Sequence, residues 1–267
     1  MRSAVTVSSQ SHQRRSRRAA APRGSAAGAP LHPHRGFDTV MYLKQGEGRH
    51  SDSMGNSGVL RAGDVQWMTA ASGIEHDEGR DHPGGVLHGF QLWVNLPAKH
   101  KMDPPAYQDV PSRAIPVVQA APGVSAKVIA GECAGVKAVV QTKVAVHYVE
   151  FVAQPGSGFT HALPAELATV FCYVTSGSGV FGPEAAPKAA AEGDMLVMSA
   201  EGDTVRFSVP PAADKPLAFL LLAGAPIREP IVRHGPFVMN TRAEIQTCFA
   251  EYQAGTFIKH KGTMATF

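Results

Sequence analysis

Two short motifs place four potential metal-ligand side chains in pairs. The first motif, HPHRGFDTV, contains His32 and His34, and the second, GIEHDEG, contains His76 and Glu78. In a β-strand, residues two apart project from the same face, so each pair can direct two donor atoms at one point. A single H-x-H is a weak signal, but two such pairs in one glycine-rich region predict a site at which four donors bind one ion.

The chemistry of this donor set narrows the choice of metal. Three imidazoles and one carboxylate, without a thiolate, suit iron, manganese, nickel, copper or zinc and disfavour a sulfur-rich structural zinc site. Four protein ligands on an ion that prefers six leave positions for water, dioxygen or a substrate oxygen. The histidines at positions 50, 82, 88 and 100 show that the region is rich in histidine, and we expect them to be surface or supporting residues.

Composition and an internal repeat indicate the scaffold that would position these residues. The chain has 267 residues with 27 Gly and 20 Pro, which predicts a mostly β protein with many turns, and it has no apolar run near 18 residues that would predict a transmembrane helix. The segment VMYLKQGEG followed by RAGDVQWMT resembles the later segment VFCYVTSGSG followed by AEGDMLVMS. Two copies of one strand–turn–strand unit predict duplicated β-barrels.

The repeat also predicts whether the second copy binds metal. Its offset is 131 residues from Tyr42 to Tyr173 and 130 residues from Asp64 to Asp194. With these offsets, the four donors of the first copy fall on Leu163, Ala165, Arg206 and Ser208. A shift of two residues in this alignment would instead place His161 at an equivalent position. Because apolar and cationic side chains cannot replace the donors, we expect the second barrel to be free of metal.

The first thirty residues differ in composition from the rest of the chain. They contain six arginines and no acidic residue, so this segment carries +6, and because the whole chain carries +3, residues 31–267 carry −3. The composition fits a mitochondrial or chloroplast transit peptide, the run RRSRR fits a nuclear-localisation patch, and a disordered tail is the third alternative. Three cysteines without a C-x-x-C spacing favour a reducing compartment. We expect a nuclear or cytoplasmic protein, or an organellar one if the segment is a transit peptide.

Four long motifs, spread from His32 to Thr241, resemble the pirin family of the cupin superfamily. They are HPHRGFDTV, GVLRAGDVQWMTAASGIEHDE, GFQLWVNLPAKHKMDPPAYQ and REPIVRHGPFVMNT. The resemblance implies an all-β bicupin, with two jelly-roll (double-stranded β-helix) barrels in tandem. It also implies one mononuclear non-haem iron in the N-terminal barrel. The family's ligands fall on His32, His34, His76 and Glu78, with Fe(2+) as the expected ion and Mn, Ni, Cu or Zn as alternatives.

The resemblance and the patterns together predict the domain limits. We expect a basic segment over residues 1–30, a metal-binding cupin barrel over 31–125, a metal-free barrel over 126–240, and a short helix with a tail over 241–267. Pirin-like chains generally have ordered strands before the first motif, and nothing in residues 1–30 resembles them. If those strands are absent, the first barrel has an open sheet edge.

Two functions are consistent with the implied metal site. One is an iron-dependent dioxygenase that opens flavonols such as quercetin at the 2,3 bond, with Glu78 as a metal ligand and as the general base. The other is an iron-dependent, redox-sensing transcriptional co-regulator without turnover. The expected partners are accordingly a small aromatic or flavonol substrate, or a transcription factor, with no direct binding to nucleic acid or membrane and with a monomeric chain. A cavity of about 300 Å3 or more beside the metal would favour a substrate.

Overall fold

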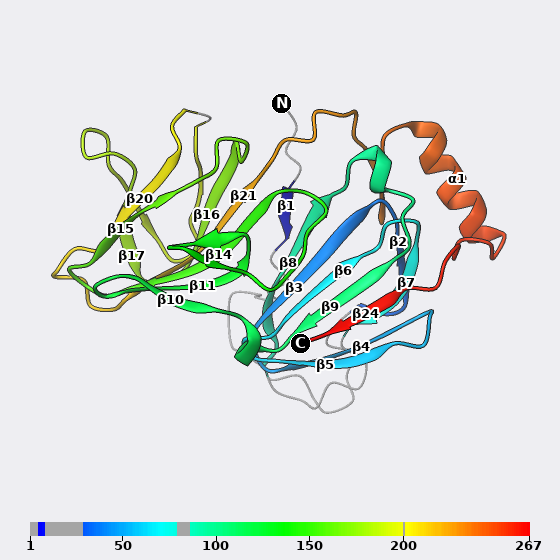
Figure 1. Cartoon of the computed structure of the whole chain (residues 1–267), viewed down its shortest axis with the longest axis horizontal. Coiled ribbons are helices and arrows are strands. Elements are labelled where there is room, and N and C mark those ends of the chain that lie inside the picture. The colour runs from blue at the N-terminus through cyan, green and yellow to red at the C-terminus, as the bar shows by residue number, and fades with distance from the viewer. Residues whose placement is uncertain (1–4, 9–28, 79–85, 200) are drawn as a thin grey trace. The chain divides into compact units, whose positions relative to one another are not determined.

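The computed structural model describes residues 5–8, 29–78, 86–199 and 201–267. The chain divides into two compact units. Unit 1 comprises Met1–Ala114 and Ile227–Phe267, and unit 2 comprises Ile115–Pro226. Each unit contains one six-stranded and one four-stranded sheet, which is the tandem cupin fold (Figure 1). Within the described part of the chain, no helix is long and apolar enough to cross a membrane.

The six-stranded sheet of unit 1 has the order β1-β8-β3-β6-β9-β24, and its four-stranded sheet has the order β2-β7-β4-β5. The strands β22 and β23 form a separate hairpin. The unit 1 elements are β1 (Val5–Ser8), β2 (His32–His34), β3 (Phe37–Gln45), β4 (Glu47–Asp52), β5 (Ser57–Arg61), β6 (Val65–Thr69), β7 (Ile74–Glu78), β8 (His88–Asn95), β9 (Ala106–Val110), β22 (Val232–His234), β23 (Phe237–Met239), β24 (Thr263–Thr266), the 3-10 helices η1 (Ala98–His100) and η2 (Ser112–Ala114), and the helix α1 (Arg242–Gln253).

Both outer strands of the unit 1 sheet come from the ends of the chain. Strand β1 pairs antiparallel with β8, and β24 pairs parallel with β9. The segment 1–30 therefore contributes a strand at Val5–Ser8, and residues 9–28 of that segment lie outside the described residues. Because β1 pairs with the N–H and C=O groups of β8, the edge of the sheet at β8 is covered, and the condition for an open edge there is not met.

The C-terminal segment belongs to unit 1, so the predicted limits at residues 125 and 240 differ from the observed division. The apolar face of α1 explains why, because it buries Ile245 and Cys248 in one cluster with Phe237 and Met239 of β23. Thr241 begins the helix with a capping box, in which its Oγ1 accepts from the Glu244 N–H. The predicted helix is thus present.

Unit 2 repeats the architecture with the orders β10-β11-β14-β21-β16-β19 and β15-β20-β17-β18, plus the small hairpin β12-β13. Successive inward positions of its long strands are apolar, so aromatic rings fill the space between the sheets. The unit 2 strands are β10 (Val117–Ala121), β11 (Val124–Ala130), β12 (Glu132–Cys133), β13 (Val136–Lys137), β14 (Val146–Ala153), β15 (Gly158–Ala162), β16 (Thr169–Ser176), β17 (Ser178–Phe181), β18 (Lys188–Ala191), β19 (Met195–Val197), β20 (Thr204–Ser208) and β21 (Leu217–Gly224).

Candidate metal centre

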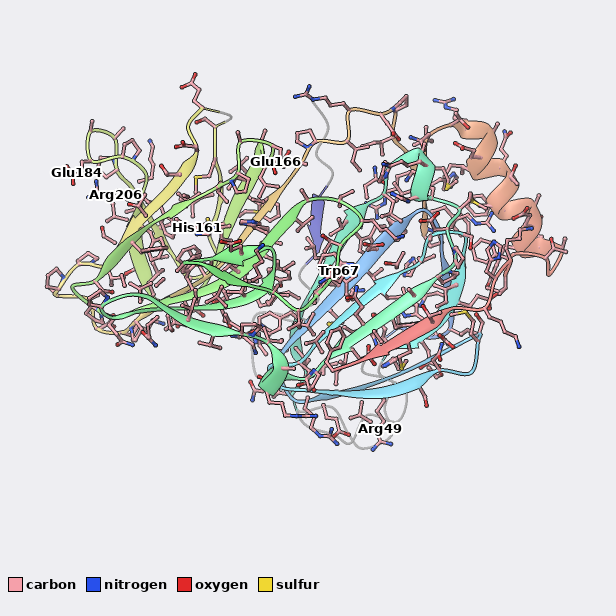
Figure 2. All side chains as sticks on the ribbon, viewed as in Figure 1. Arg49, Trp67, His161, Glu166, Glu184 and Arg206 are labelled. Atoms are coloured by element: carbon pink, nitrogen blue, oxygen red, sulfur yellow. The ribbon has the colours of Figure 1, made fainter. Side chains whose placement is uncertain are left out.

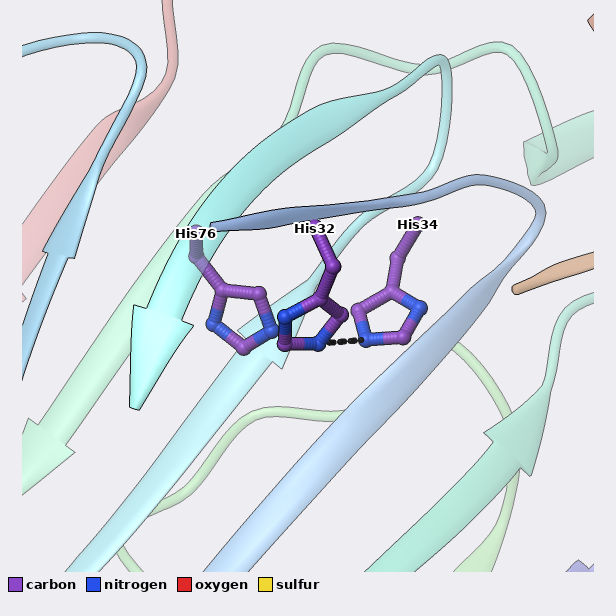
Figure 3. Close-up of side chains that lie close together, drawn as sticks. All are labelled: His32, His34 and His76. Atoms are coloured by element: carbon purple, nitrogen blue, oxygen red, sulfur yellow. Dashed lines mark hydrogen bonds between the residues drawn. The ribbon is translucent and has the colours of Figure 1, made fainter. Parts of the chain in front are cut away.

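Strands β2 and β7 bring three of the predicted ligands together. His32 lies opposite His76 in the antiparallel ladder, and His34 projects from the same face of β2 as His32. One ring nitrogen from each of the three histidines lies within 4.8 Å of the others, and the Nε2 atoms of His32 and His34 are 3.0 Å apart (Figure 3). Three donors from two paired strands thus converge on one point, as the i, i+2 spacing predicted.

Burial keeps two of these imidazoles neutral. His34 is 4% exposed and His76 is fully buried. Burial, reinforced by His32, lowers the pKa of His34 to about 3, and burial with the neighbouring His34 and His32 sets the pKa of His76 well below its ordinary value. A neutral imidazole has a free lone pair for a metal ion. Neither ring nitrogen of His76 has a hydrogen-bond partner among the described residues, as expected of a residue that binds a metal ion.

Backbone carbonyls orient two of the rings. His32 Nδ1 lies 2.7 Å from the Pro30 carbonyl oxygen, and His34 Nδ1 lies 3.3 Å from the Pro236 carbonyl oxygen. Because Nδ1 donates to a carbonyl, the Nε2 atom of each ring remains available toward the cluster. The histidine cluster therefore depends on the C-terminal segment of unit 1, which supplies Pro236.

The turn after β2 is fixed by the same C-terminal segment. Gly36 has φ +91°, and a Cβ atom there would lie only 2.0 Å from the Val238 carbonyl oxygen, so this position requires glycine. The buried Arg35 pairs with Glu251 of α1 at 2.7 Å and donates to the Phe257 carbonyl oxygen. These contacts hold the end of β2 and thereby the position of His34. Sequence reasoning missed them, because they join residues about 200 positions apart.

The fourth predicted ligand, Glu78, lies outside the cluster of three histidines. Its Oε1 accepts a hydrogen bond from Gln91 Nε2 at 3.2 Å, and burial raises the pKa of its carboxyl group. Glu78 is two residues after His76 on β7 and therefore on the same face of the strand. Its role as a ligand stays a prediction.

A cavity of about 40 Å3 lies beside Glu78. Its polar lining comes from Arg49, His50, Gln66 and Glu78, and its apolar lining includes Met41, Leu43, Leu60 and Leu87. A space of this size admits a few water-sized molecules and is well below the roughly 300 Å3 of a typical ligand pocket. The cavity is therefore too small in this form for a whole flavonol.

The other histidines of this region have different environments. His50 is 4% exposed and lies 3.1 Å from Asp109, so it is a buried member of the cavity wall. His100 bonds to Asp103, His88 is partly exposed, and His82 lies outside the described residues. Sequence analysis did not single out Asp109, although polar residues at inward-facing positions of a strand are a usable signal.

Unit 2 has the equivalent pair of strands with a different donor set. His161 of β15 lies opposite Val205 of β20, just as His32 lies opposite His76. The predicted equivalence with Arg206 and Ser208 was therefore wrong by one residue, which in a strand turns the side chain to the other face. Figure 2 shows His161 among the strands of unit 2 and Arg206 beside Glu184, with which it forms an ion pair.

The two-residue shift in the alignment thus places His161 at the position of His32. Val205 of unit 2 then corresponds to His76 of unit 1. Two residues further along each strand, Phe207 corresponds to Glu78, and Leu163 corresponds to His34. Three of the four predicted donors are replaced by apolar side chains.

Comparison with known proteins identifies relatives of both units. The Pirin family model matches residues 6–94, and the Pirin C-terminal cupin domain model matches residues 148–258. A pirin-like protein of Solanum lycopersicum is 43% identical over 229 residues, which cover 86% of this chain and 76% of the relative.

Solved structures resemble most of the chain as well. A quercetin 2,3-dioxygenase from Acinetobacter baumannii superposes with a TM-score of 0.81 at 35% identity and covers 90% of this chain and 83% of its own. The bacterial pirin YhhW from Escherichia coli, solved in complex with nickel(II), shares the fold with a TM-score of 0.57 at 21% identity, over 74% of this chain and 77% of its own.

Proposed function

This chain belongs to the pirin family, and from that premise we propose that unit 1 binds one mononuclear non-haem iron ion and acts as a dioxygenase on flavonols such as quercetin. The observation that carries the proposal is the convergence of three imidazole nitrogens within 4.8 Å of one another, two of them from the buried His34 and His76. The similarity to the Acinetobacter baumannii quercetin 2,3-dioxygenase supports the choice of reaction.

The residues present fit a borderline divalent ion. His32, His34 and His76 would hold it, and Glu78 would complete the set. Iron, when bound, supplies a centre at which dioxygen and a substrate oxygen can meet. The nickel(II) complex of YhhW supports nickel as an alternative to iron, and Mn, Cu and Zn suit the same donors.

Glu78 is the proposed proton acceptor. The O–H bond of a flavonol hydroxyl would break, and its proton would pass to a carboxylate oxygen of Glu78. Burial raises the pKa of this carboxyl group, which makes its carboxylate a stronger base than an exposed one. Gln91 donates to Oε1 and so fixes the orientation of the carboxylate. The apolar lining of the cavity, which includes Leu43 and Leu60, would limit the access of water.

One observation favours a second function. The cavity of about 40 Å3 is too small for a whole flavonol, whereas an ion that only changes its redox state needs no substrate pocket. The alternative is therefore an iron-dependent, redox-sensing transcriptional co-regulator without turnover, whose partner would be a DNA-binding protein in the nucleus.

The first test combines metal content with oxygen uptake. The full chain is purified without oxygen, its metals are quantified, and oxygen uptake is followed after addition of quercetin. The Glu78→Gln variant runs in parallel. Stoichiometric iron together with oxygen uptake that the variant lacks would support the enzyme and its base.

Other outcomes separate the two functions. Bound iron with no oxygen uptake would favour the co-regulator. A protein purified without any metal, and unable to take up added Fe(2+), would contradict both.

A further inference from the structure

A buried lysine lies where three of the four family motifs meet. Lys101 of the motif GFQLWVNLPAKHKMDPPAYQ is 1% exposed. Its Nζ donates to the Gly36 carbonyl oxygen of the first motif at 2.6 Å and to the Val238 carbonyl oxygen of the last motif at 2.8 Å. A third bond, at 2.7 Å, goes to Asn95 Oδ1 at the end of β8. These three bonds use all three N–H donors of the ammonium group.

The side chain of Lys101 is a buried cation at neutral pH. Burial lowers the pKa of Lys101 to about 8, and the negative charges of Glu229, Glu244 and Asp38 act in the opposite direction. Because a pKa of about 8 lies above 7, the ammonium form predominates at pH 7. A buried charge is stabilised only where its hydrogen bonds are made, so the three acceptor oxygens and the ammonium group depend on one another.

The backbone segments that Lys101 joins also hold the ring of His34. An isolated parallel bridge connects Arg35 to Phe237. One residue earlier in each segment, the Pro236 carbonyl oxygen lies 3.3 Å from His34 Nδ1. The two segments therefore run side by side, with the bond to His34 at one end of their contact and Lys101 at the other.

The two segments approach each other closely at Lys101. A Cβ atom at Gly36 would lie 2.0 Å from the Val238 carbonyl oxygen, which is the atom that accepts from Lys101. The carbonyl oxygens of Gly36 and Val238 carry like partial charges, so an apolar group in place of the ammonium would leave them to repel each other. Because Pro236 precedes Val238 by two residues, such a movement would displace the carbonyl that orients His34.

We propose that Lys101 is a positioning residue of the candidate metal centre, which holds the Pro236 carbonyl oxygen against His34 Nδ1 and thereby directs His34 Nε2 at the metal ion. A hydrogen bond to the second ring nitrogen sets the orientation of a metal-binding histidine, and losing such support weakens metal binding by roughly ten- to a hundredfold. This role rests on the proposed function, because it requires His34 to be a metal ligand.

The test measures Co(II) binding by the full chain and by its Lys101→Met variant. Methionine keeps most of the apolar stem and removes all three donors. Co(II) suits imidazole donors, and its visible absorption changes with the geometry of its ligands. We expect Lys101→Met to bind Co(II) about tenfold more weakly than the parent protein and to shift the absorption bands, because the ring of His34 is no longer held in one orientation.

A control variant separates this effect from a loss of stability. Val65→Ala shortens a fully buried side chain of β6 that pairs with Tyr42, near the opposite end of β3 from Phe37. It is Phe37 that packs against His34, with ring centroids 5.1 Å apart. Val65→Ala should therefore destabilise unit 1 and keep the Co(II) affinity and absorption of the parent protein.

A milder variant keeps the proposal testable if Lys101→Met does not fold. Asn95→Ala removes one of the three acceptors and retains the ammonium group. We expect it to weaken Co(II) binding about threefold and to shift the absorption in the same direction as Lys101→Met, since the cation loses part of its fixed geometry.

A double-mutant cycle tests whether Lys101 acts through His34. In a His34→Ala background, Lys101→Met should cause no further loss of Co(II) affinity, because the ring that it positions is gone. In a His76→Ala background, the same substitution should still weaken binding about tenfold, because His34 remains a ligand there.

Two results would overturn the role of Lys101. One is a Co(II) affinity and absorption that neither Lys101→Met nor Asn95→Ala changes, and the other is an equal loss from Lys101→Met with and without His34. The proposed function is judged on the parent protein alone. A parent protein that binds iron and takes up oxygen, with Lys101→Met equal to it, would sustain the dioxygenase and refute the positioning role. A parent protein that binds no Co(II) would contradict the metal site itself and this role with it.

Discussion

The two units share the strand order of their four-stranded sheets but differ in the side chains that they direct into the space between the sheets. In unit 1, β2 and β7 present His32, His34 and His76 to one another. In unit 2, the equivalent strands retain one histidine, His161, and present Val205 opposite it. The cupin scaffold therefore tolerates either a donor cluster or an apolar core at the same positions.

The interiors of the two units also differ in how they are stabilised. Unit 2 packs Phe207 against Phe219 and Phe151, with ring centroids 4.8 Å and 5.1 Å apart, so its interior is stabilised by apolar burial. Unit 1 buries His76 with neither ring nitrogen partnered among the described residues, which costs stability until an ion binds it, whereas the buried His147 and His161 of unit 2 each leave one ring nitrogen without a described partner. We therefore expect unit 2 to be stable without metal and unit 1 to gain stability from it.

The largest expected effect is the loss of an apolar ring from unit 2. Phe207→Ala should lower the free energy of unfolding by about 3 to 5 kcal/mol, because the ring is 1% exposed and its removal leaves a cavity. Urea denaturation of the full chain without bound metal measures this. Glu78→Gln, at the equivalent place in unit 1, serves as the matched control and should change stability by at most about 1 kcal/mol. A small effect of both variants would mean that the two interiors do not differ as described.

The second largest expected effect is on metal binding, which should depend on the histidines of unit 1 and not on those of unit 2. His76→Ala removes one donor of the cluster and should weaken iron binding at least about a hundredfold, which corresponds to about 2.7 kcal/mol. His161→Ala makes the same change at a buried histidine of unit 2 and should leave the metal content of the full chain unchanged. Metal analysis after dialysis against a weak chelator distinguishes the two variants. Loss of metal from His161→Ala would show that unit 2 also binds an ion.

An acid titration should reveal the retained histidine of unit 2. Burial lowers the pKa of His161 to about 4, and the nearby His147 adds to this. As the pH falls below 6.5, the unfolded chain binds a proton that the folded chain does not, so stability is lost until the pH reaches about 4. Between pH 7 and pH 4.5 the loss due to His161 should be about 2 to 3 kcal/mol.

His161→Phe isolates this contribution. The variant should lose less stability than the parent protein over the same pH interval in urea denaturation, because all other titrating groups are retained. An identical pH profile for both proteins would contradict a buried, neutral His161.

The sequence was sufficient to predict much of the unit 1 site. The spacing of His32, His34 and His76 predicted a shared face, and the ladder between β2 and β7 confirms it. The internal repeat predicted two copies of one barrel, which the two sets of sheets confirm. These predictions succeeded because strand periodicity is local and survives in the sequence pattern.

Long-range contacts were beyond the reach of the sequence. The Pro236 carbonyl that orients His34, the Glu251 carboxylate that pairs with Arg35, and the β24 strand beside β9 all come from the far end of the chain. The alignment of the repeats failed by one residue at Val205, because segment offsets do not determine the register of a strand. Glu78 fell outside the histidine cluster for a similar reason, since spacing predicts a face but not a side-chain conformation.

The smallest expected effect tests which unit the C-terminal helix belongs to. Thr241→Ala removes the capping box of α1 and should cost about 1 kcal/mol. Thr247→Ala, in the middle of the same helix, is the matched control and should cost less, since alanine favours helix interiors. Because α1 packs in unit 1, the loss should appear in the unfolding transition that added Fe(2+) moves to higher urea. A loss confined to the metal-independent transition would instead place the helix with unit 2.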